Sequence, residues 1–225
     1  MSRAHPTRSR SQPERSARAE PERSARTQPE RSAATQAALI SAARRLWGAR
    51  GYAEVGTPEI AEAAGVTRGA MYHQYADKAA LFRAVIEAVE TEAMERLSAA
   101  VLAAEPGSPA AALRIAADAW LAIATEPEIR RLVLLDAPAV LGWAAWRELG
   151  QRYGLGMTEQ LLASAIEAGE LRAQPVRPLA TVLLGAIDEA ALVIADAADP
   201  AAAQADVRAV VHDLLDGLLQ AGSAL

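Results

Sequence analysis

The sequence predicts an all-α fold. Hydrophobic residues make up 52% of the 225 residues, alanine and leucine are abundant, and runs of the kind that form strands are few. Prolines and glycines divide the chain into segments in which apolar residues recur every three or four positions, as on a helix that buries one face. A chain of this length can bury a sizeable core, so we expect a helical domain at 35–82 and a larger helical domain at 83–225.

The first 34 residues have a different composition. An eight-residue repeat begins at Pro13, Pro21 and Pro29, each time with the sequence Pro-Glu-Arg-Ser-Ala. The repeat contains no large apolar side chain that could offset the entropy lost on ordering, so we predict that residues 1–34 form a disordered tail. The tail holds eight arginines and four glutamates. This charge fits a solvated tail without a specific partner, and it also fits an arm that contacts nucleic acid.

Three helices are predicted in the domain at 35–82. The first, at 35–50, places alanines, leucines and a tryptophan on one face. Thr57 is positioned to cap the second helix, and Gly65 ends it, because glycine adopts a positive φ without a Cβ clash. Thr67 is then positioned to cap the third helix, at 68–75.

The third helix has a polar surface with little to bury. Met71 is its one candidate for the core, supported by Tyr75. The other side chains form hydrogen bonds or are small enough to approach another surface: Arg68, Gly69, Ala70, Tyr72, His73 and Gln74. Two helices joined by a glycine turn are typical of a helix-turn-helix, whose second helix enters the major groove of DNA. Because other helical hairpins share this spacing, a helical adaptor that binds protein is the alternative.

The same region carries an ordered set of residues, from an aromatic side chain in the first helix to a lysine at the start of the fourth. They are Leu46-Trp47-Gly48-Ala49-Arg50-Gly51-Tyr52, Thr57, Ile60-Ala61, Ala64-Gly65-Val66-Thr67-Arg68-Gly69, Tyr72-His73 and Asp77-Lys78. This set, which covers about fifty residues, resembles the N-terminal domain of TetR-type transcriptional repressors. Trp47 and Tyr75 stand where that family usually has phenylalanine, and both keep an aromatic side chain. The resemblance implies a homodimeric repressor that binds a palindromic operator in double-stranded DNA and is released by a small molecule.

The third helix and its flanks are expected to make two kinds of DNA contact. Phosphate contacts are expected from Thr57, Thr67, Tyr72, His73 and Lys78. Base contacts are expected from Arg68, Ala70 and Gln74, since arginine pairs with guanine, alanine meets the thymine methyl group and glutamine pairs with adenine. Gly69 is expected to let the helix lie close to the DNA.

Six further helices are predicted beyond this region. Their expected ranges are 77–104, 109–125, 127–136, 142–168, 178–198 and 200–222. In the last two, apolar side chains form a stripe that could close the core of one chain or pair with a second chain. The resemblance to TetR-type repressors implies the second use, a homodimer formed through 178–198 and 200–222.

Aromatic and methionine residues in the middle helices are candidates for a ligand pocket. Tryptophans at helical spacing are more often core residues than ligand contacts, so the spacing leaves both uses open. The resemblance implies that a pocket for an amphipathic or aromatic effector of unknown identity lies among these helices. The candidate lining residues are Met94, Trp120, Trp143, Trp146, Tyr153 and Met157.

Several classes of protein are disfavoured by composition. The absence of cysteine excludes disulfide frameworks and thiolate metal sites. The three histidines lack metal-ligand spacing, and the acidic clusters at Asp188-Glu189 and at Asp213 and Asp216 are expected on solvated helix faces. We therefore expect no enzyme activity, no cofactor and no metal site.

Charge and hydropathy indicate where the partners bind. The net charge of −5 divides into +4 in residues 1–34, +1 in 35–82 and −10 in 83–225, so DNA should be accepted only at the N-terminal end. No uninterrupted apolar run reaches the length of a membrane span. A cytoplasmic protein without membrane contact is the expectation.

Overall fold

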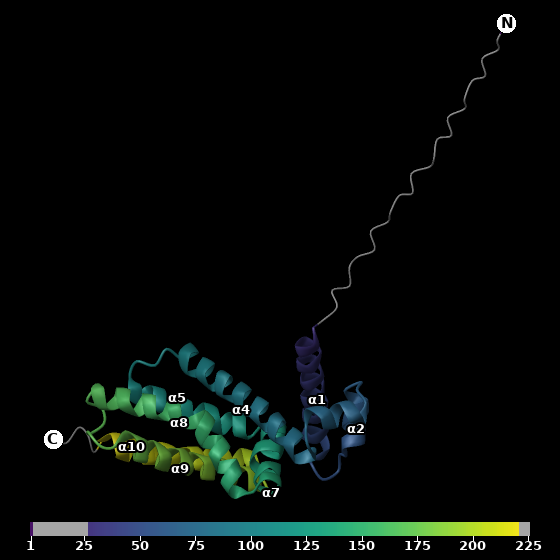
Figure 1. Cartoon of the computed structure of the whole chain (residues 1–225). Coiled ribbons are helices and arrows are strands. Elements are labelled where there is room, and N and C mark those ends of the chain that lie inside the picture. The colour runs from purple at the N-terminus through teal and green to yellow at the C-terminus, as the bar shows by residue number, and fades with distance from the viewer. Residues whose placement is uncertain (2–26, 221–225) are drawn as a thin grey trace.

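The computed structural model describes Met1 and residues 27–220 of the chain (Figure 1). In that part of the chain every regular element is a helix, which confirms the all-α prediction. An N-terminal head forms around α1 (Gln28–Arg50), and the C-terminal helices form a larger body. One long helix, α4 (Lys78–Ala103), runs from the head into the body and belongs to both.

Helix α1 begins seven residues before its predicted start, at Gln28 instead of residue 35. The prediction of disorder is therefore wrong for residues 28–34, which include the third repeat unit. The physical reason is a capping box: Thr27 Oγ1 accepts a hydrogen bond from Glu30 N at 3.4 Å, and Glu30 Oε2 accepts one from Thr27 N at 2.7 Å. Pro29 lies in the first turn, where a missing N–H is tolerated. The first two repeat units lie outside the described residues.

The head contains the predicted helix-turn-helix, formed by α2 (Thr57–Ala63) and α3 (Arg68–Gln74). Gly65 between them has a φ of +68°, the left-handed conformation for which glycine was expected. Thr67 Oγ1 accepts a hydrogen bond from Ala70 N at 3.1 Å, so the predicted cap of the third helix is also confirmed.

The predicted capping role of Thr57 is wrong. Gly56 is the N-cap of α2, and Thr57 is the first helical residue, with no cap hydrogen bond from its side chain. Its hydroxyl lies 3.2 Å from Tyr72 Oη instead, and the residue is buried. Thr57 thus joins α2 to α3 because its side chain points toward the neighbouring helix rather than back along its own.

Aromatic packing holds the head together. Trp47, Tyr52 and Phe82 form a triangle with ring centroids 4.9–5.4 Å apart, and Trp47 and Phe82 are fully buried. Trp47 Nε1 donates a hydrogen bond to Val55 O at 3.4 Å. Residues from α1, the loop after it and α4 therefore share one core.

The body consists of the helices that follow α4. They are α5 (Pro109–Ala124), α6 (Pro127–Ile129), the π-helix η1 (Arg130–Asp136), α7 (Ala137–Leu141), α8 (Trp143–Glu167), α9 (Val176–Asp196) and α10 (Pro200–Gln220). The predicted boundaries differ from these by no more than two residues, except at the end of the helix predicted at 127–136. Residues 221–222 of the last prediction lie outside the described residues. Contacts between α8 and α9, and between α9 and α10, stack the C-terminal helices side by side.

Two prolines lie within helices instead of at the helix boundaries that the sequence predicts. The helix predicted at 127–136 continues to Leu141, because the π-helical hydrogen bond from Ala137 N to Leu132 O changes the register just before Pro138. Pro138 then falls in the first turn of α7, where it needs no N–H. Pro178 is the predicted first residue of the helix at 178–198. It lies inside the first turn of α9, which begins two residues earlier at Val176.

The head is attached to the body by polar contacts from this irregular helix at 127–141. Arg44 Nε and Nη2 donate to the two carboxylate oxygens of Glu128 at 2.8 and 2.7 Å. Asp136 Oδ2 accepts a hydrogen bond from the Tyr52 backbone N–H at 2.9 Å. The helix at 127–141 therefore forms hydrogen bonds both with α1 and with the loop that follows it.

Among the described helices, α9 alone is long and apolar enough to cross a membrane, by length and composition only. It is packed against α8 and α10, and 22% of its most apolar window is buried. An apolar helix with so much uncovered surface is equally suited to a protein partner.

We predict that Phe82→Ala lowers the free energy of unfolding by about 3–5 kcal/mol, because it removes the ring shared by α1, Tyr52 and α4. The urea midpoint at constant m-value measures this loss. Leu102→Ala is the matched control, since Leu102 on α4 is 77% exposed and should change stability by less than about 0.5 kcal/mol. Equal losses in the two variants would contradict the assigned packing.

Candidate functional site

The outer surface of α3 consists of the residues that the sequence placed there. Met71 is fully buried, which leaves Arg68, Gly69 and His73 exposed, Tyr72 45% exposed and the remaining side chains half-buried. A Cβ added at Gly69 would meet no atom closer than Thr67 Oγ1 at 3.9 Å, so the backbone there faces open space. This helix therefore presents arginine, tyrosine and histidine side chains away from the core.

Tyr72 is oriented by its neighbours. The hydrogen bond with the Thr57 hydroxyl and the nearby Arg68 guanidinium hold the pKa of the Tyr72 phenol below its ordinary value. If the Thr57 hydroxyl donates in this pair, the single hydroxyl proton of Tyr72 remains available for a phosphate oxygen. Thr57 itself is buried, so its predicted phosphate contact stays a prediction and its observed contact is with Tyr72.

Gln74 is linked to the extension of α1. Ser32 Oγ donates a hydrogen bond to Gln74 Oε1 at 3.1 Å, across 42 residues of sequence. The amide nitrogen of Gln74 is not used in that bond. The third repeat unit, which the sequence assigned to a tail, therefore orients a side chain predicted to read DNA bases.

Lys78 is turned toward its own chain. Its Nζ donates to Tyr52 O at 2.6 Å and lies 3.9 Å from the centroid of the Tyr52 ring. Partial burial lowers the pKa of the Lys78 ammonium. The predicted phosphate contact of Lys78 stays a prediction, and it would require the ammonium to exchange this carbonyl for a phosphate or to bridge the two.

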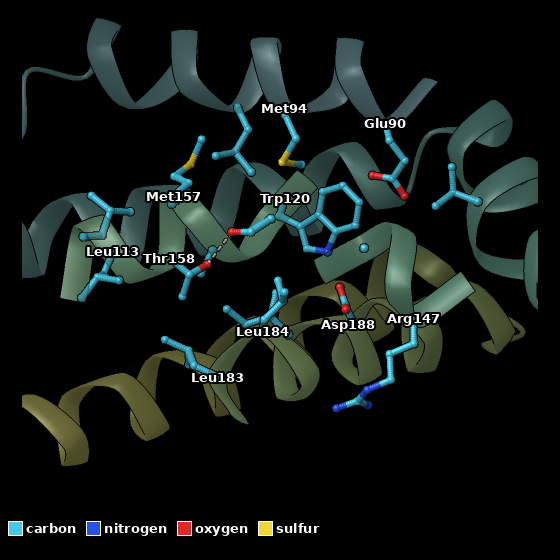
Figure 2. A pocket seen from close by; sticks show the side chains of 18 of the residues that line it. Glu90, Met94, Leu113, Trp120, Arg147, Met157, Thr158, Leu183, Leu184 and Asp188 are labelled. Carbon is cyan, nitrogen blue, oxygen red and sulfur yellow. Dashed lines mark hydrogen bonds between the residues drawn. The ribbon is translucent and has the colours of Figure 1, made fainter. Parts of the chain in front are cut away.

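A second candidate site is a cavity in the body that is partly open to solvent, and its space of about 830 Å³ includes solvent at its mouth (Figure 2). Helices α4, α5, η1, α8, α9 and α10 all contribute to its wall. Most of the lining is apolar, with leucine, methionine and tryptophan side chains facing the space.

The cavity includes four of the six side chains predicted for a pocket: Met94, Trp120, Trp146 and Met157. The other two lie outside it. Trp143 is 54% exposed, and its ring centroid lies 4.8 Å from that of Trp146 with the rings tilted. Tyr153 lines a separate shallow groove that Met94 also lines. Whether any of these residues binds a ligand stays a prediction.

Two carboxyl groups in the cavity were not predicted. Glu90 on α4 is only 4% exposed, and Asp188 on α9 lines the same space, although the sequence placed Asp188 on a solvated face. That expectation about Asp188 is wrong, because α9 turns this position toward α8. The spacing did contain a signal for Glu90: it falls four residues after Ile86 and seven before Leu97, on the buried stripe of α4.

Comparisons with known proteins bear directly on this arrangement of a helix-turn-helix and a hollow helical body. Residues 39–85 match the model for bacterial regulatory proteins of the tetR family, and residues 110–218 match the model for the tetracyclin repressor-like C-terminal domain. The crystal structure of a TetR-family transcriptional regulator from Pectobacterium atrosepticum is 34% identical, with a TM-score of 0.76, over 86% of this chain and 98% of that one. The chain belongs to the TetR family of transcriptional regulators.

Two other similar proteins match this TetR-family regulator either over a shorter stretch or at lower identity. It is 36% identical over 96 residues to the HTH-type transcriptional regulator AcrR of Shigella flexneri, a match that spans 43% of this chain and only 44% of that relative. The structure of RolR in complex with the ligand resorcinol has the same fold, with a TM-score of 0.64 and 19% identity over 88% of this chain and 97% of that one.

Family membership decides between the classes considered from the sequence. TetR-family proteins are DNA-binding transcriptional regulators and not enzymes, so the adaptor alternative is wrong and the expectation of a non-enzyme holds. Among the described residues, no group of three or more histidine, aspartate or glutamate side chains is arranged to hold a metal ion.

The burial of Glu90 generates a prediction about pH. Burial, and secondarily the charge of Asp188, raise the Glu90 pKa from 4.5 to about 7, so the folded state holds this proton more tightly than the unfolded state. The stability contributed by protonated Glu90 is therefore present below about pH 4.5 and is lost as pH rises through about 7. We expect Glu90→Gln to be more stable than the parent at pH 8 by about 3 kcal/mol, and by much less at pH 5.

Thermal unfolding of the parent and of Glu90→Gln at pH 5 and pH 8 measures this difference. Glu95→Gln is the matched control, since Glu95 lies on the same helix and is exposed, and its Tm should follow that of the parent at both values. A Glu90→Gln variant whose Tm advantage is the same at both pH values would show that this carboxyl is not titrating in the folded protein.

Proposed function

We propose that this TetR-family regulator is a cytoplasmic, homodimeric repressor that binds a palindromic operator and is released when a small amphipathic or aromatic molecule enters the body cavity. The observation that carries the proposal is the pairing of an outward-facing α3 with a largely apolar cavity in the helices attached to it. In this proposal the DNA-binding domain is the head, about residues 35–82 with the α1 extension added, and residues 83–225 bind effector and partner.

The exposed face of α3 suits the major groove. Arg68 is exposed and positioned next to Tyr72, so its guanidinium can donate two hydrogen bonds to a guanine while the phenol lies at the backbone. Ala70 and Gln74 follow on the same helix as candidates for the neighbouring bases. Contacts to phosphate, expected from Tyr72, His73 and Lys78, would position the helix without reading sequence.

We expect Arg68→Ala to reduce discrimination at one operator base position by about 1–3 kcal/mol. Lys78→Ala should weaken binding to all sequences alike and reduce the salt slope by about 1. Gel shifts on DNA from upstream of the protein's own gene, with single-base variants and a series of salt concentrations, measure both effects. Arg172→Ala is the matched control, because Arg172 is an exposed arginine in the loop after α8.

The opposite pattern, with uniform weakening from Arg68→Ala and relaxed specificity from Lys78→Ala, would contradict the assigned contacts. Because Lys78 also binds Tyr52 O, a thermal melt of Lys78→Ala should accompany the gel shift. An unchanged Tm together with an unchanged affinity would remove Lys78 from the proposed interface.

Uncovered apolar side chains on α9 and α10 support a homodimer. Val182 is 70% exposed, Val193 50%, Val210 58% and Leu214 59%, and the last three lie along one groove between the two helices. The opposite sides of these helices close the core of the chain, where Val211, Leu215 and Leu219 are buried. The helix pair can therefore close the core of its own chain with one face and pair with a second chain through the other.

We expect Leu214→Asp to convert a dimer of twice 23.7 kDa into a monomer of 23.7 kDa, because a carboxylate would be buried without a partner. Light scattering after gel filtration measures the mass. The control is Leu102→Asp, which should leave the mass unchanged because Leu102 is an exposed leucine on α4, away from this groove. A parent chain that elutes as a monomer, or a Leu214→Asp variant that stays dimeric, would contradict this interface.

The irregular helix at 127–141 offers a route by which an occupied cavity could affect DNA binding. Val133 and Leu134 of η1 line the cavity, and Asp136 of the same π-helix accepts the hydrogen bond from Tyr52 N in the head. A molecule that displaces η1 would therefore move a group that touches the head. By linkage, such a molecule lowers DNA affinity by the same factor by which DNA lowers its own affinity.

A further inference from the structure

The acidic end of the body cavity contains two carboxyl groups without partners. Neither Glu90 nor Asp188 forms a hydrogen bond or an ion pair with any of the residues 27–220 that the structure describes. Other acidic side chains in the body are paired; Asp118, for example, binds both Arg208 and His212. The two carboxyls of the cavity are therefore exceptions, and one of them is almost completely buried.

The surroundings of these carboxyls contain no competing cation aimed at them. Arg147 on α8 is the one other charged residue in the lining, and its side chain is exposed and extends away from the cavity in Figure 2. The lining residues from α5, η1 and α10 carry no charge. Glu90 thus faces mainly apolar groups, whereas Asp188 also lines a smaller neighbouring hollow together with Arg147 and Gln151.

A buried hydrogen-bond donor lies beside the carboxyls. The Trp120 indole N–H is buried and has no acceptor among the described residues, and in Figure 2 its ring lies at the same end of the cavity as Glu90 and Asp188. Such a group ordinarily finds a partner when it is buried. A molecule that offers an acceptor here, next to a group that neutralises the carboxyls, would satisfy all three side chains.

Burial makes the ionised form of these groups unfavourable. It raises the pKa of Glu90 to about 7 and, despite the opposing charge of Arg147, the pKa of Asp188 to about 6. Near neutral pH the cavity therefore holds negative charge that the protein compensates only in part, through Arg147 near Asp188. An ammonium group placed between the carboxylates would compensate it in a low-dielectric setting, where charge-assisted hydrogen bonds are strong.

We propose that the cavity binds an amphipathic amine, with its ammonium group between Glu90 and Asp188 and its apolar or aromatic body along the methionine and leucine side chains toward Leu113. The proposal rests on the proposed effector role of the cavity and adds the chemical class of the effector. In Figure 2 Leu113 and Met157 lie toward the opposite end from Asp188, and Met94 lies between them and Trp120, so one molecule would span both regions.

A neutral phenol or alcohol is the competing class. It could donate a hydrogen bond to one carboxylate, but it would leave the negative charge in the cavity uncompensated. An anionic molecule would add repulsion to both carboxylates. The three classes are therefore expected to bind in the order amine, alcohol, carboxylate, and they can be compared on one hydrocarbon skeleton.

The test uses the full chain and three probes, 4-phenylbutylamine, 4-phenylbutan-1-ol and 4-phenylbutyrate, in isothermal titration calorimetry without DNA. At pH 8 we expect the amine to bind roughly tenfold tighter than the alcohol, the scale of one charge-assisted hydrogen bond, and the carboxylate to bind most weakly. At pH 5.5 the preference for the amine should shrink, because it must then displace protons from Glu90 and Asp188. Equal affinities for the amine and the alcohol at pH 8 would overturn the proposal.

Variants assign the preference to these carboxyls. Glu90→Gln and Asp188→Asn keep the shape of each side chain and should each remove most of the preference for the amine, while binding of the alcohol stays within about twofold. Glu95→Gln, on the exposed side of α4, should keep the preference. An amine preference that survives in both Glu90→Gln and Asp188→Asn would place the ammonium elsewhere and overturn the assignment.

A separate gel shift distinguishes this proposal from the repressor function. If the amine binds with the stated preference but operator affinity does not change, the ligand class stands and release from DNA by this cavity is contradicted. If operator binding is as proposed but the amine shows no preference over the alcohol, the repressor function stands and the ligand class is overturned.

Discussion

The attachment of the head to the helix at 127–141 is the constraint on which the rest of the molecule depends. A recognition helix is useful to a dimer only if each copy is held at a fixed angle to its body. Arg44 binds Glu128 with two hydrogen bonds, and Asp136 holds the Tyr52 N–H at the end of α1. Helix α4 is also shared by both parts and lines the cavity, so the head and the cavity wall are joined through this helix as well.

Local features of the head could be predicted because each depends on a few adjacent residues. Gly65 needs a positive φ, Thr67 caps α3 with its own side chain, and Met71 is the one buried residue of a largely polar helix. These effects operate within a turn or two of helix, so the sequence contains them. The ordered set of residues from Trp47 to Lys78 then identified the family, whose presence the comparisons confirm.

Other features depend on tertiary contacts that the sequence does not display. The extension of α1 needs the Thr27 capping box and gains a partner in Gln74, 42 residues away from Ser32. Threonine is a residue type that often caps helices, but the Thr57 hydroxyl pairs with the Tyr72 hydroxyl and does not cap α2. Asp188 was assigned to solvent because charged pairs on helices usually are solvated, and only the packing of α9 against α8 places it in the cavity. Buried polar groups of this kind are the exceptions that a pattern of hydrophobicity misses.

The most direct measurement of the central claim is the width of the distance distribution between the two heads of the proposed dimer. The chain has no cysteine, so Ala49→Cys, at an exposed position near the end of α1, provides one nitroxide site in each protomer for double electron–electron resonance. We predict one narrow distribution in the otherwise unchanged chain and a clearly broader one when Asp136→Ala is added, with the helical circular dichroism signal unchanged. Equal widths in the two proteins would contradict the claim that this contact holds the head in place.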